Sequence, residues 1–260
     1  MIEEIISYFI LGLVQGLTEF LPVSSSGHLT LCSELLGIQS DDITFKILVH
    51  FATALSTIIV FRKDIIELAI GFFSSSSDKS RKYIGFLAFS CIPAAAVGFT
   101  LKDQIESLDS PHFVGYMLLV TALILVISQK LNSDLEKGVN SKSAMLIGVS
   151  QAFAILPGIS RSGSTISTAL LLGISRSEAA RFSFLMALPV ILGATLLECK
   201  DMVEQGVTAS GPLLGYLVGV IAAFISGLLA CKLMIKLVKG TNLLWFAVYC
   251  AVVGVIAIII

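Results

Sequence analysis

The sequence predicts an all-α polytopic membrane protein that is built as an inverted-topology repeat. The first observation is the composition, since 56 % of the 260 residues are hydrophobic, only 13 % are charged, and the mean hydropathy is +0.95. No water-soluble domain of this size could bury that much apolar sequence in one core. The second is that Lys and Arg are concentrated in alternate loops, and the third is that two Ser-rich segments resemble each other.

Six full transmembrane spans account for most of the apolar sequence. Each segment is about long enough to cross a hydrocarbon layer of ~30 Å as an α-helix. The segments are residues 44–61, 83–101, 112–130, 178–197, 211–231 and 241–260.

Most of the basic residues lie on one side of this alternation of spans and loops, whereas Lys46, Lys102 and Lys200 lie in the opposite loops. The residues on the first side are Arg62, Lys63, Lys79, Arg81, Lys82, Lys130, Lys137, Lys142, Arg176, Arg181, Lys232, Lys236 and Lys239. The opposite loops are mainly acidic. By the positive-inside rule the basic set is cytoplasmic, which places both chain ends outside.

Two further segments are expected to enter the membrane without crossing it. The charge alternation requires residues 143–175 to leave the cytoplasmic side and return to it, and residues 1–43 to start and finish outside. Both segments are apolar and are interrupted by Pro, Gly and Ser, as a half-spanning pair of helices with a polar tip requires. We therefore expect two re-entrant helical hairpins.

The two hairpins are similar in sequence. A shift of 136 positions superposes GLVQGLTEFLPVSSSGHLTL, from Gly12, on GVSQAFAILPGISRSGSTIS, from Gly148. Three spans follow each hairpin, so the single membrane domain, residues 1–260, divides into repeats 1–135 and 136–260 of opposite orientation. The tips should then meet near mid-membrane. The matched pairs are Gly12 with Gly148, Gln15 with Gln151, Ser24 with Ser160, Ser26 with Ser162, and Gly27 with Gly163.

Ionisable side chains at membrane depth mark these tips as a functional site. Glu19, His28 and Arg161 would each be costly there unless paired or close to water. A purely structural Glu19–Arg161 pair explains neither His28 nor the hydroxyl groups around it. His50, on an apolar face of the first span, is instead expected to be a packing residue. The polar neighbours at the tips are Gln15, Ser24, Ser25, Ser26, Ser160, Ser162, Ser164 and Thr165.

These residue types suit a phosphate or diphosphate ligand. Arg161 is a bidentate donor beside serines and the start of a half-helix near Gly163. Gln15 and Glu19 are one helical turn apart and could share a divalent cation that neutralises phosphate charge. Ser25 and His28 supply a hydroxyl and an imidazole that could attack phosphorus or transfer a proton.

Two motifs at these tips resemble the undecaprenyl-diphosphate phosphatase family of bacteria, also called the bacitracin-resistance protein. They are QGLTEFLPVSSSGH and PGISRSGST, and the resemblance extends over essentially the whole chain. It implies a multi-pass plasma-membrane hydrolase with a divalent cation, Mg²⁺ or Ca²⁺, and an active site on the outer side. That enzyme converts a C55 isoprenoid diphosphate into the monophosphate and inorganic phosphate, which recycles the carrier for peptidoglycan and confers bacitracin resistance.

The resemblance also implies roles for the matching residues. Glu19 would hold the metal or act as a base, with Gln15 at the variable first position of its motif. Ser25 and His28 are candidates for nucleophile and proton transfer and are left unranked, and water remains an alternative nucleophile. Binding of the diphosphate would fall to Ser24, Ser26, Ser160, Arg161, Ser162 and Thr165.

Two other function classes remain to be weighed. A lipid-phosphate transporter or flippase is the main alternative, because inverted repeats with broken helices are common in transporters. A phosphatidic-acid-type phosphatase needs a distal His, and no His follows His112. The expected partners are a polyprenyl diphosphate and membrane lipids, with no nucleic acid, and a homodimer is compatible with the sequence.

Overall fold

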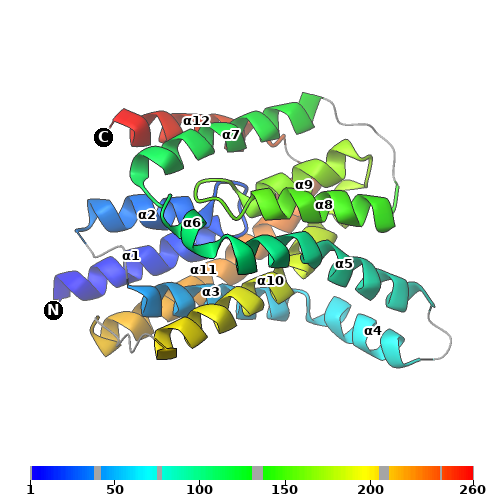
Figure 1. The fold of residues 1–260 in the computed structure, drawn as a ribbon, viewed down its shortest axis with the longest axis horizontal. Coiled ribbons are helices and arrows are strands. Elements are labelled where there is room, and N and C mark those ends of the chain that lie inside the picture. Colours follow the sequence, from blue (N-terminus) through cyan, green and yellow to red (C-terminus); the bar gives the residue numbers. More distant parts are fainter. Residues whose placement is uncertain are drawn as a thin grey trace.

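The computed structural model describes residues 2–37, 42–74, 78–130, 137–204, 211–240 and 242–259. Within these ranges the regular elements are α-helices, apart from an isolated bridge between Lys137 and Ile174, so the all-α prediction is confirmed. Most helices run along the long axis of the molecule (Figure 1). The helices are α1 Ile2–Thr18, α2 Ser25–Leu35, α3 Ile43–Val60, α4 Arg62–Phe73, α5 Asp78–Thr100, α6 Lys102–Glu106, α7 Pro111–Lys130, α8 Ser141–Phe153, α9 Arg161–Leu171, α10 Arg176–Glu204, α11 Leu213–Gly240 and α12 Leu244–Ile259.

Five of these helices are long and apolar enough to cross a membrane. They are α3, α5, α7, α10 and α11, and they coincide with the first five spans that the sequence predicts. The remaining predicted span, 241–260, corresponds to α12, which is apolar but has only 16 residues within the described chain. The chain is therefore a polytopic helical membrane protein.

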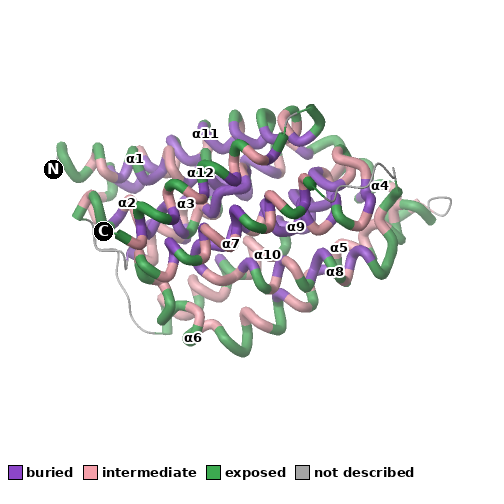
Figure 2. Tube along the Cα trace, turned by 90° about the horizontal axis from the view of Figure 1, so that it is seen from above, coloured by how far each residue is buried: buried purple, intermediate pink, exposed green. Residues whose placement is uncertain are grey.

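Exposed apolar side chains cover much of the outer surface. Phe73, Leu196 and Trp245, for example, expose 83 %, 71 % and 74 % of their surface. Buried and exposed positions alternate along the long helices, so each presents one side to its neighbours and another to the surroundings (Figure 2). Such extensive apolar exposure is unfavourable in water and is expected where lipid covers the protein.

Two pairs of short helices, α1–α2 and α8–α9, are each joined by a turn, and the two turns occupy related positions in the sequence. In the first pair α1 ends at Thr18 and α2 begins at Ser25, with the Ser24 hydroxyl accepting a hydrogen bond from Gly27 N at 3.3 Å. In the second pair α9 begins at Arg161, and the Ser160 hydroxyl accepts from Gly163 N at 3.1 Å. A serine N-cap thus starts the second helix of each pair, and the caps are related by the 136-residue shift.

The tips of the two pairs meet in the middle of the molecule. Figure 1 shows α1 and α2 extending inward from the end that carries both described termini, while α8 and α9 extend inward from the opposite end. The Ser162 hydroxyl on the second tip donates to the Leu21 carbonyl on the first at 3.0 Å. Ser24 has φ of 70°, a conformation that is costly for a residue with a side chain and is typically retained at functional sites.

Each pair packs against a long helix through a glycine. Helix α1 lies on α11 and α8 lies on α5. A Cβ atom added to Gly12 would overlap the backbone of Gly219, and one added to Gly148 would overlap the carbonyl group of Ser90. Gly12 and Gly148 are also partners under the 136-residue shift, so the two close helix contacts are equivalent.

Substitution of Gly148 by Ala is expected to lower the stability of the protein. Alanine is the better helix former by roughly 1 kcal/mol, but its Cβ would force α8 away from α5, and such overpacking typically costs about 1–3 kcal/mol. Thermal unfolding in detergent measures the effect. Gly85→Ala in α5 is the matched control because nothing lies within 4 Å of its added Cβ. An unchanged melting temperature for Gly148→Ala would contradict the close contact.

Candidate active site

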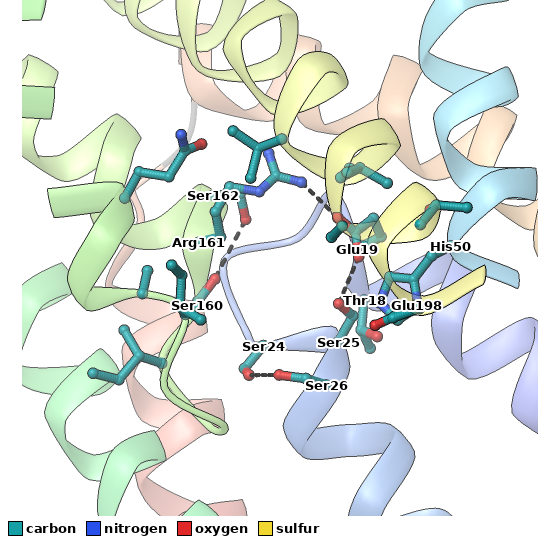
Figure 3. Close-up of a pocket in the computed structure, with 18 residues that line it drawn as sticks. Thr18, Glu19, Ser24, Ser25, Ser26, His50, Ser160, Arg161, Ser162 and Glu198 are labelled. Carbon is teal, nitrogen blue, oxygen red and sulfur yellow. Dashed lines mark hydrogen bonds and ion pairs between the residues drawn. The ribbon is translucent and has the colours of Figure 1, made fainter. Parts of the chain in front are cut away.

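A cavity of about 190 Å³ lies where the two tips meet. The first tip contributes Thr18, Glu19 and the serines Ser24 to Ser26, and the second contributes Ser160, Arg161 and Ser162. Helices α3 and α10 close the cavity with further side chains, including His50 and Glu198 (Figure 3). The two tips thus give the cavity a group of polar side chains.

Glu19 is the hydrogen-bonding centre of this cavity. Its side chain is buried, and its Oε1 atom pairs with Arg161 Nη2 at 2.5 Å. Its Oε2 atom accepts hydrogen bonds from Ser25 Oγ at 2.6 Å and Gln15 Nε2 at 3.0 Å. Figure 3 shows Glu19 between Arg161 and Ser25. One carboxylate therefore joins the two tips and orients a hydroxyl group.

Only one of the two terminal nitrogens of Arg161 takes part in this ion pair. Arg161 is the first residue of α9, and 16 % of its side chain is exposed. Nη2 binds Glu19, whereas Nη1 is buried and has no hydrogen-bond partner among the described residues. A guanidinium at a helix N-terminus with a free N–H group can bind an oxyanion such as phosphate.

The serines form matching pairs on the two tips. Ser24 Oγ lies 3.4 Å from Ser26 Oγ, and Ser160 Oγ lies 3.3 Å from Ser162 Oγ. All four line the cavity, as does Ser25. The structure therefore brings together most of the residues that the sequence indicates: Glu19, Ser24, Ser25, Ser26, Ser160, Arg161 and Ser162.

Three residues to which the resemblance assigns a role do not line the cavity, and neither does Ser164. Gln15 is fully buried, and its Nε2 atom donates to Glu19 Oε2. His28 is buried, with Nδ1 2.8 Å from the Ser24 carbonyl and Nε2 2.8 Å from the Tyr249 hydroxyl, and its ring stacks on Tyr249. The Thr165 hydroxyl donates to the Arg161 carbonyl at 2.8 Å and lies 2.6 Å from Ser183 Oγ. These contacts hold α2 and α9 in place, and the chemical roles expected for the three residues stay predictions.

Sequence reasoning missed several residues of the cavity. We expected His50 to pack on an apolar face, but it lines the cavity, and its Nδ1 donates to the Lys46 carbonyl at 2.8 Å. Glu198 and Thr195 of α10 also line it, as does Gln151 of α8. The match of Gln151 with Gln15 in the repeat was the one sequence signal that could have identified any of these.

The first tip offers a limited set of oxygen ligands for a divalent cation. Within the described ranges, no three His, Cys, Asp or Glu side chains are grouped closely enough to hold a metal by themselves. Glu19 supplies a carboxylate. The buried Oε1 atom of Gln15 accepts no hydrogen bond from any described residue. Mg²⁺ usually binds one or two carboxylates together with substrate phosphates, so the donors fit a cation that arrives with its substrate.

Comparison with known proteins gives one consistent result. Residues 8–256 match the family model described as bacitracin resistance protein BacA. The chain is 47 % identical over 262 residues to the undecaprenyl-diphosphatase of Christiangramia forsetii, with 98 % of each chain covered. It is 45 % identical over 255 residues to that of Bacteroides fragilis, with 96 % of each covered. It is also 40 % identical over 275 residues to that of Methanosphaera stadtmanae, covering 99 % of this chain and 98 % of the relative. With this match over nearly its whole length, the chain belongs to the bacitracin resistance protein BacA family.

Proposed function

We propose that this chain is an undecaprenyl-diphosphatase. It hydrolyses undecaprenyl diphosphate, or a similar polyprenyl diphosphate, to the monophosphate and inorganic phosphate, and so recycles the lipid carrier of cell-wall synthesis and confers bacitracin resistance. The names of its relatives support this activity. The observation that carries the proposal is the Arg161–Glu19–Ser25 chain of contacts, which joins an anion-binding group, a base and a hydroxyl in one cavity.

The geometry favours a direct role for Ser25 in the reaction. Ser25 Oγ attacks the terminal phosphorus while its proton passes to Glu19, and the bond from that phosphorus to the bridging oxygen breaks to release the lipid monophosphate. Glu19 passes this proton to the departing lipid monophosphate. Water then attacks the phosphoserine, Glu19 takes a proton from the water and gives it to Ser25 Oγ as the Oγ–P bond breaks, and inorganic phosphate leaves. Arg161 holds the phosphoryl oxygens and stabilises their charge in the transition state. Attack by water in place of Ser25 is the alternative.

A divalent cation, Mg²⁺ or Ca²⁺, is part of the proposal. Glu19 and Gln15 Oε1 are the groups that would hold it, together with phosphate oxygens. When bound it would neutralise charge on the diphosphate. The amide of Gln15 is a weaker ligand than a carboxylate, so we expect the cation to depend on substrate for tight binding.

We also propose the finer membrane arrangement that the sequence predicts. The α1–α2 pair, within residues 1–43, and the α8–α9 pair, within residues 143–175, are two re-entrant hairpins, and α12 completes six spans in repeats 1–135 and 136–260. The matched caps and glycine contacts support the repeat. Both described termini lie at one end of the molecule, and α4, which begins with Arg62 and Lys63, lies at the other (Figure 1), which supports external termini in a plasma membrane.

The same arrangement supports entry of substrate from the outer side. Glu198 lies in the last third of α10, toward the outer end in this orientation, and it lines the cavity. The polyprenyl tail would remain among the helices and membrane lipids. A homodimer is a further proposal, which size-exclusion chromatography with light scattering on the detergent-solubilised protein would test.

Phosphate release is the test of the proposed function. Purified protein in detergent should release inorganic phosphate from farnesyl or undecaprenyl diphosphate when Mg²⁺ or Ca²⁺ is added, and a chelator should abolish the release. If phosphate release continued in the presence of the chelator, the hydrolysis would not need a divalent cation, and that part of the proposal would be wrong. Folded protein that releases no phosphate from either substrate would contradict the enzyme and leave the lipid-phosphate transporter in its place.

A further inference from the structure

Three residues that line the cavity have polar side-chain atoms with no hydrogen-bond partner within the described chain. Gln151 is 1 % exposed, and neither its Oε1 nor its Nε2 atom is bonded. Thr195 is 8 % exposed and its hydroxyl is unpartnered, as is Arg161 Nη1. All three residues line the cavity.

Such a group of unpartnered atoms is unusual in a folded protein. Buried polar groups are nearly always hydrogen-bonded, and an isolated unsatisfied group is destabilising. Here an amide, a hydroxyl and a guanidinium belong to residues that line the same cavity, and each can donate to a ligand. An oxyanion with several acceptor oxygens, such as a phosphate group, would satisfy these donors together.

The position of Thr195 on α10 indicates which phosphate would bind there. Val190, Ile191 and Ala194 line the cavity before Thr195, and Glu198 lines it after. These residues lie on one face of the helix, with the apolar end separated from the acidic end. Ile155 and Ile159, from the turn that follows α8, add to the apolar lining beside Gln151. A phosphate bound by Gln151 and Thr195 therefore adjoins the apolar part of the cavity.

The reactive pair comes from a different segment of the chain. Ser25 and Glu19 belong to the first tip, and Gln151 and Thr195 belong to α8 and α10. Arg161 contacts the reactive pair, because its Nη2 atom donates to Glu19. Its Nη1 atom has no partner in the described structure and is free to bind a second phosphate. A diphosphate could thus bind both groups at once, with Arg161 between its two phosphates.

We propose that Gln151, Thr195 and Arg161 Nη1 form a subsite for the phosphate that stays attached to the lipid, while the terminal phosphate faces Ser25 and Glu19. The assignment rests on the proposed function and adds to it the residues that recognise a lipid-linked phosphate. It follows that the lipid monophosphate product binds this subsite and competes with substrate. Inorganic phosphate, which forms beside Ser25, depends on it far less.

The test compares the two products as inhibitors of farnesyl diphosphate hydrolysis. In Gln151→Leu and in Thr195→Val, the inhibition constant of farnesyl phosphate should rise about tenfold, as expected for loss of a hydrogen bond to a charged group. The inhibition constant of inorganic phosphate should change by less than about twofold in both variants. Ser167→Ala is the matched control, because Ser167 is another buried unpartnered hydroxyl of the described chain but does not line the cavity.

A thermal-shift measurement keeps the test independent of turnover. Because each variant replaces an unpartnered polar group by an apolar one, its ligand-free melting temperature should stay the same or rise. The stabilisation by farnesyl phosphate should fall in both variants and persist in Ser167→Ala.

Three outcomes would overturn the subsite. These are unchanged inhibition by farnesyl phosphate, an equal loss of inhibition by both products, or a lower ligand-free melting temperature in both variants with normal inhibition. Failure of the proposed function is a different result, namely no phosphate release by the unaltered protein.

Discussion

Replacement of Arg161 by Ala is expected to lower kcat/KM for polyprenyl diphosphate hydrolysis by about 10³-fold or more, as for other arginines that stabilise a transferring phosphoryl group. The side chain binds Glu19 with Nη2 and keeps Nη1 buried and unpartnered in the described structure, so its loss removes both the anchor of the first tip and an anion donor. Steady-state phosphate release over a range of substrate concentrations measures the effect.

Folding must be separated from catalysis in this variant. Removing one partner of a buried ion pair typically destabilises a protein by about 3–5 kcal/mol, because Glu19 would be left charged without its partner. Arg161→Lys is the matched control, since it keeps the charge but not the two-pronged donor geometry. We expect it to retain most of the thermal stability and to recover only part of the activity. Full activity in Arg161→Ala would contradict this account, because it would show that the substrate phosphate does not bind at Arg161.

Replacement of Glu19 by Gln is expected to lower kcat by about 10²–10⁴-fold, the usual contribution of a general base. The amide has the same size, and its single oxygen can keep the hydrogen bond from Arg161, but it then presents an NH2 group to Ser25 and cannot take the Ser25 proton. The loss should therefore appear mainly in kcat, with a smaller change in KM. Single-turnover phosphate release separates the chemical step from product release.

An exposed glutamate provides the control for Glu19→Gln. Glu34 lies in α2, the helix that begins at Ser25, and it faces away from the cavity. Glu34→Gln should keep the activity of the unaltered protein. If Glu19→Gln kept half of that activity or more, Glu19 would be a structural partner of Arg161 and not a base.

The long helices could be predicted because apolar length and basic loops determine them directly. Five predicted spans coincide with helices of sufficient length. The amphipathic helix α4 was missed, because its first residues, Arg62 and Lys63, belong to the basic set that the sequence analysis treated as loop. Most of its apolar residues lie on the surface, where hydropathy alone does not separate a helix from a connecting segment.

The positions of the histidines could not be predicted because they depend on helix rotation. Ser25 and His28 are three residues apart in α2, yet Ser25 faces the cavity while His28 contacts Tyr249, which is 221 residues away in sequence. His50 lies on an apolar helix, and only the packing of α3 beside α10 turns it toward the cavity. Residues at the turns themselves were easier to predict, because caps and turn chemistry are local.

The most direct test of the account uses the protein in sealed vesicles with a polyprenyl diphosphate whose terminal phosphate carries ³²P. The account predicts that label leaves the lipid as inorganic phosphate, with one lipid monophosphate formed for each phosphate released, and that Arg161→Ala abolishes the release. Label that stays on the lipid, while the intact diphosphate changes leaflet, would contradict a hydrolytic site between the two tips and identify a transporter.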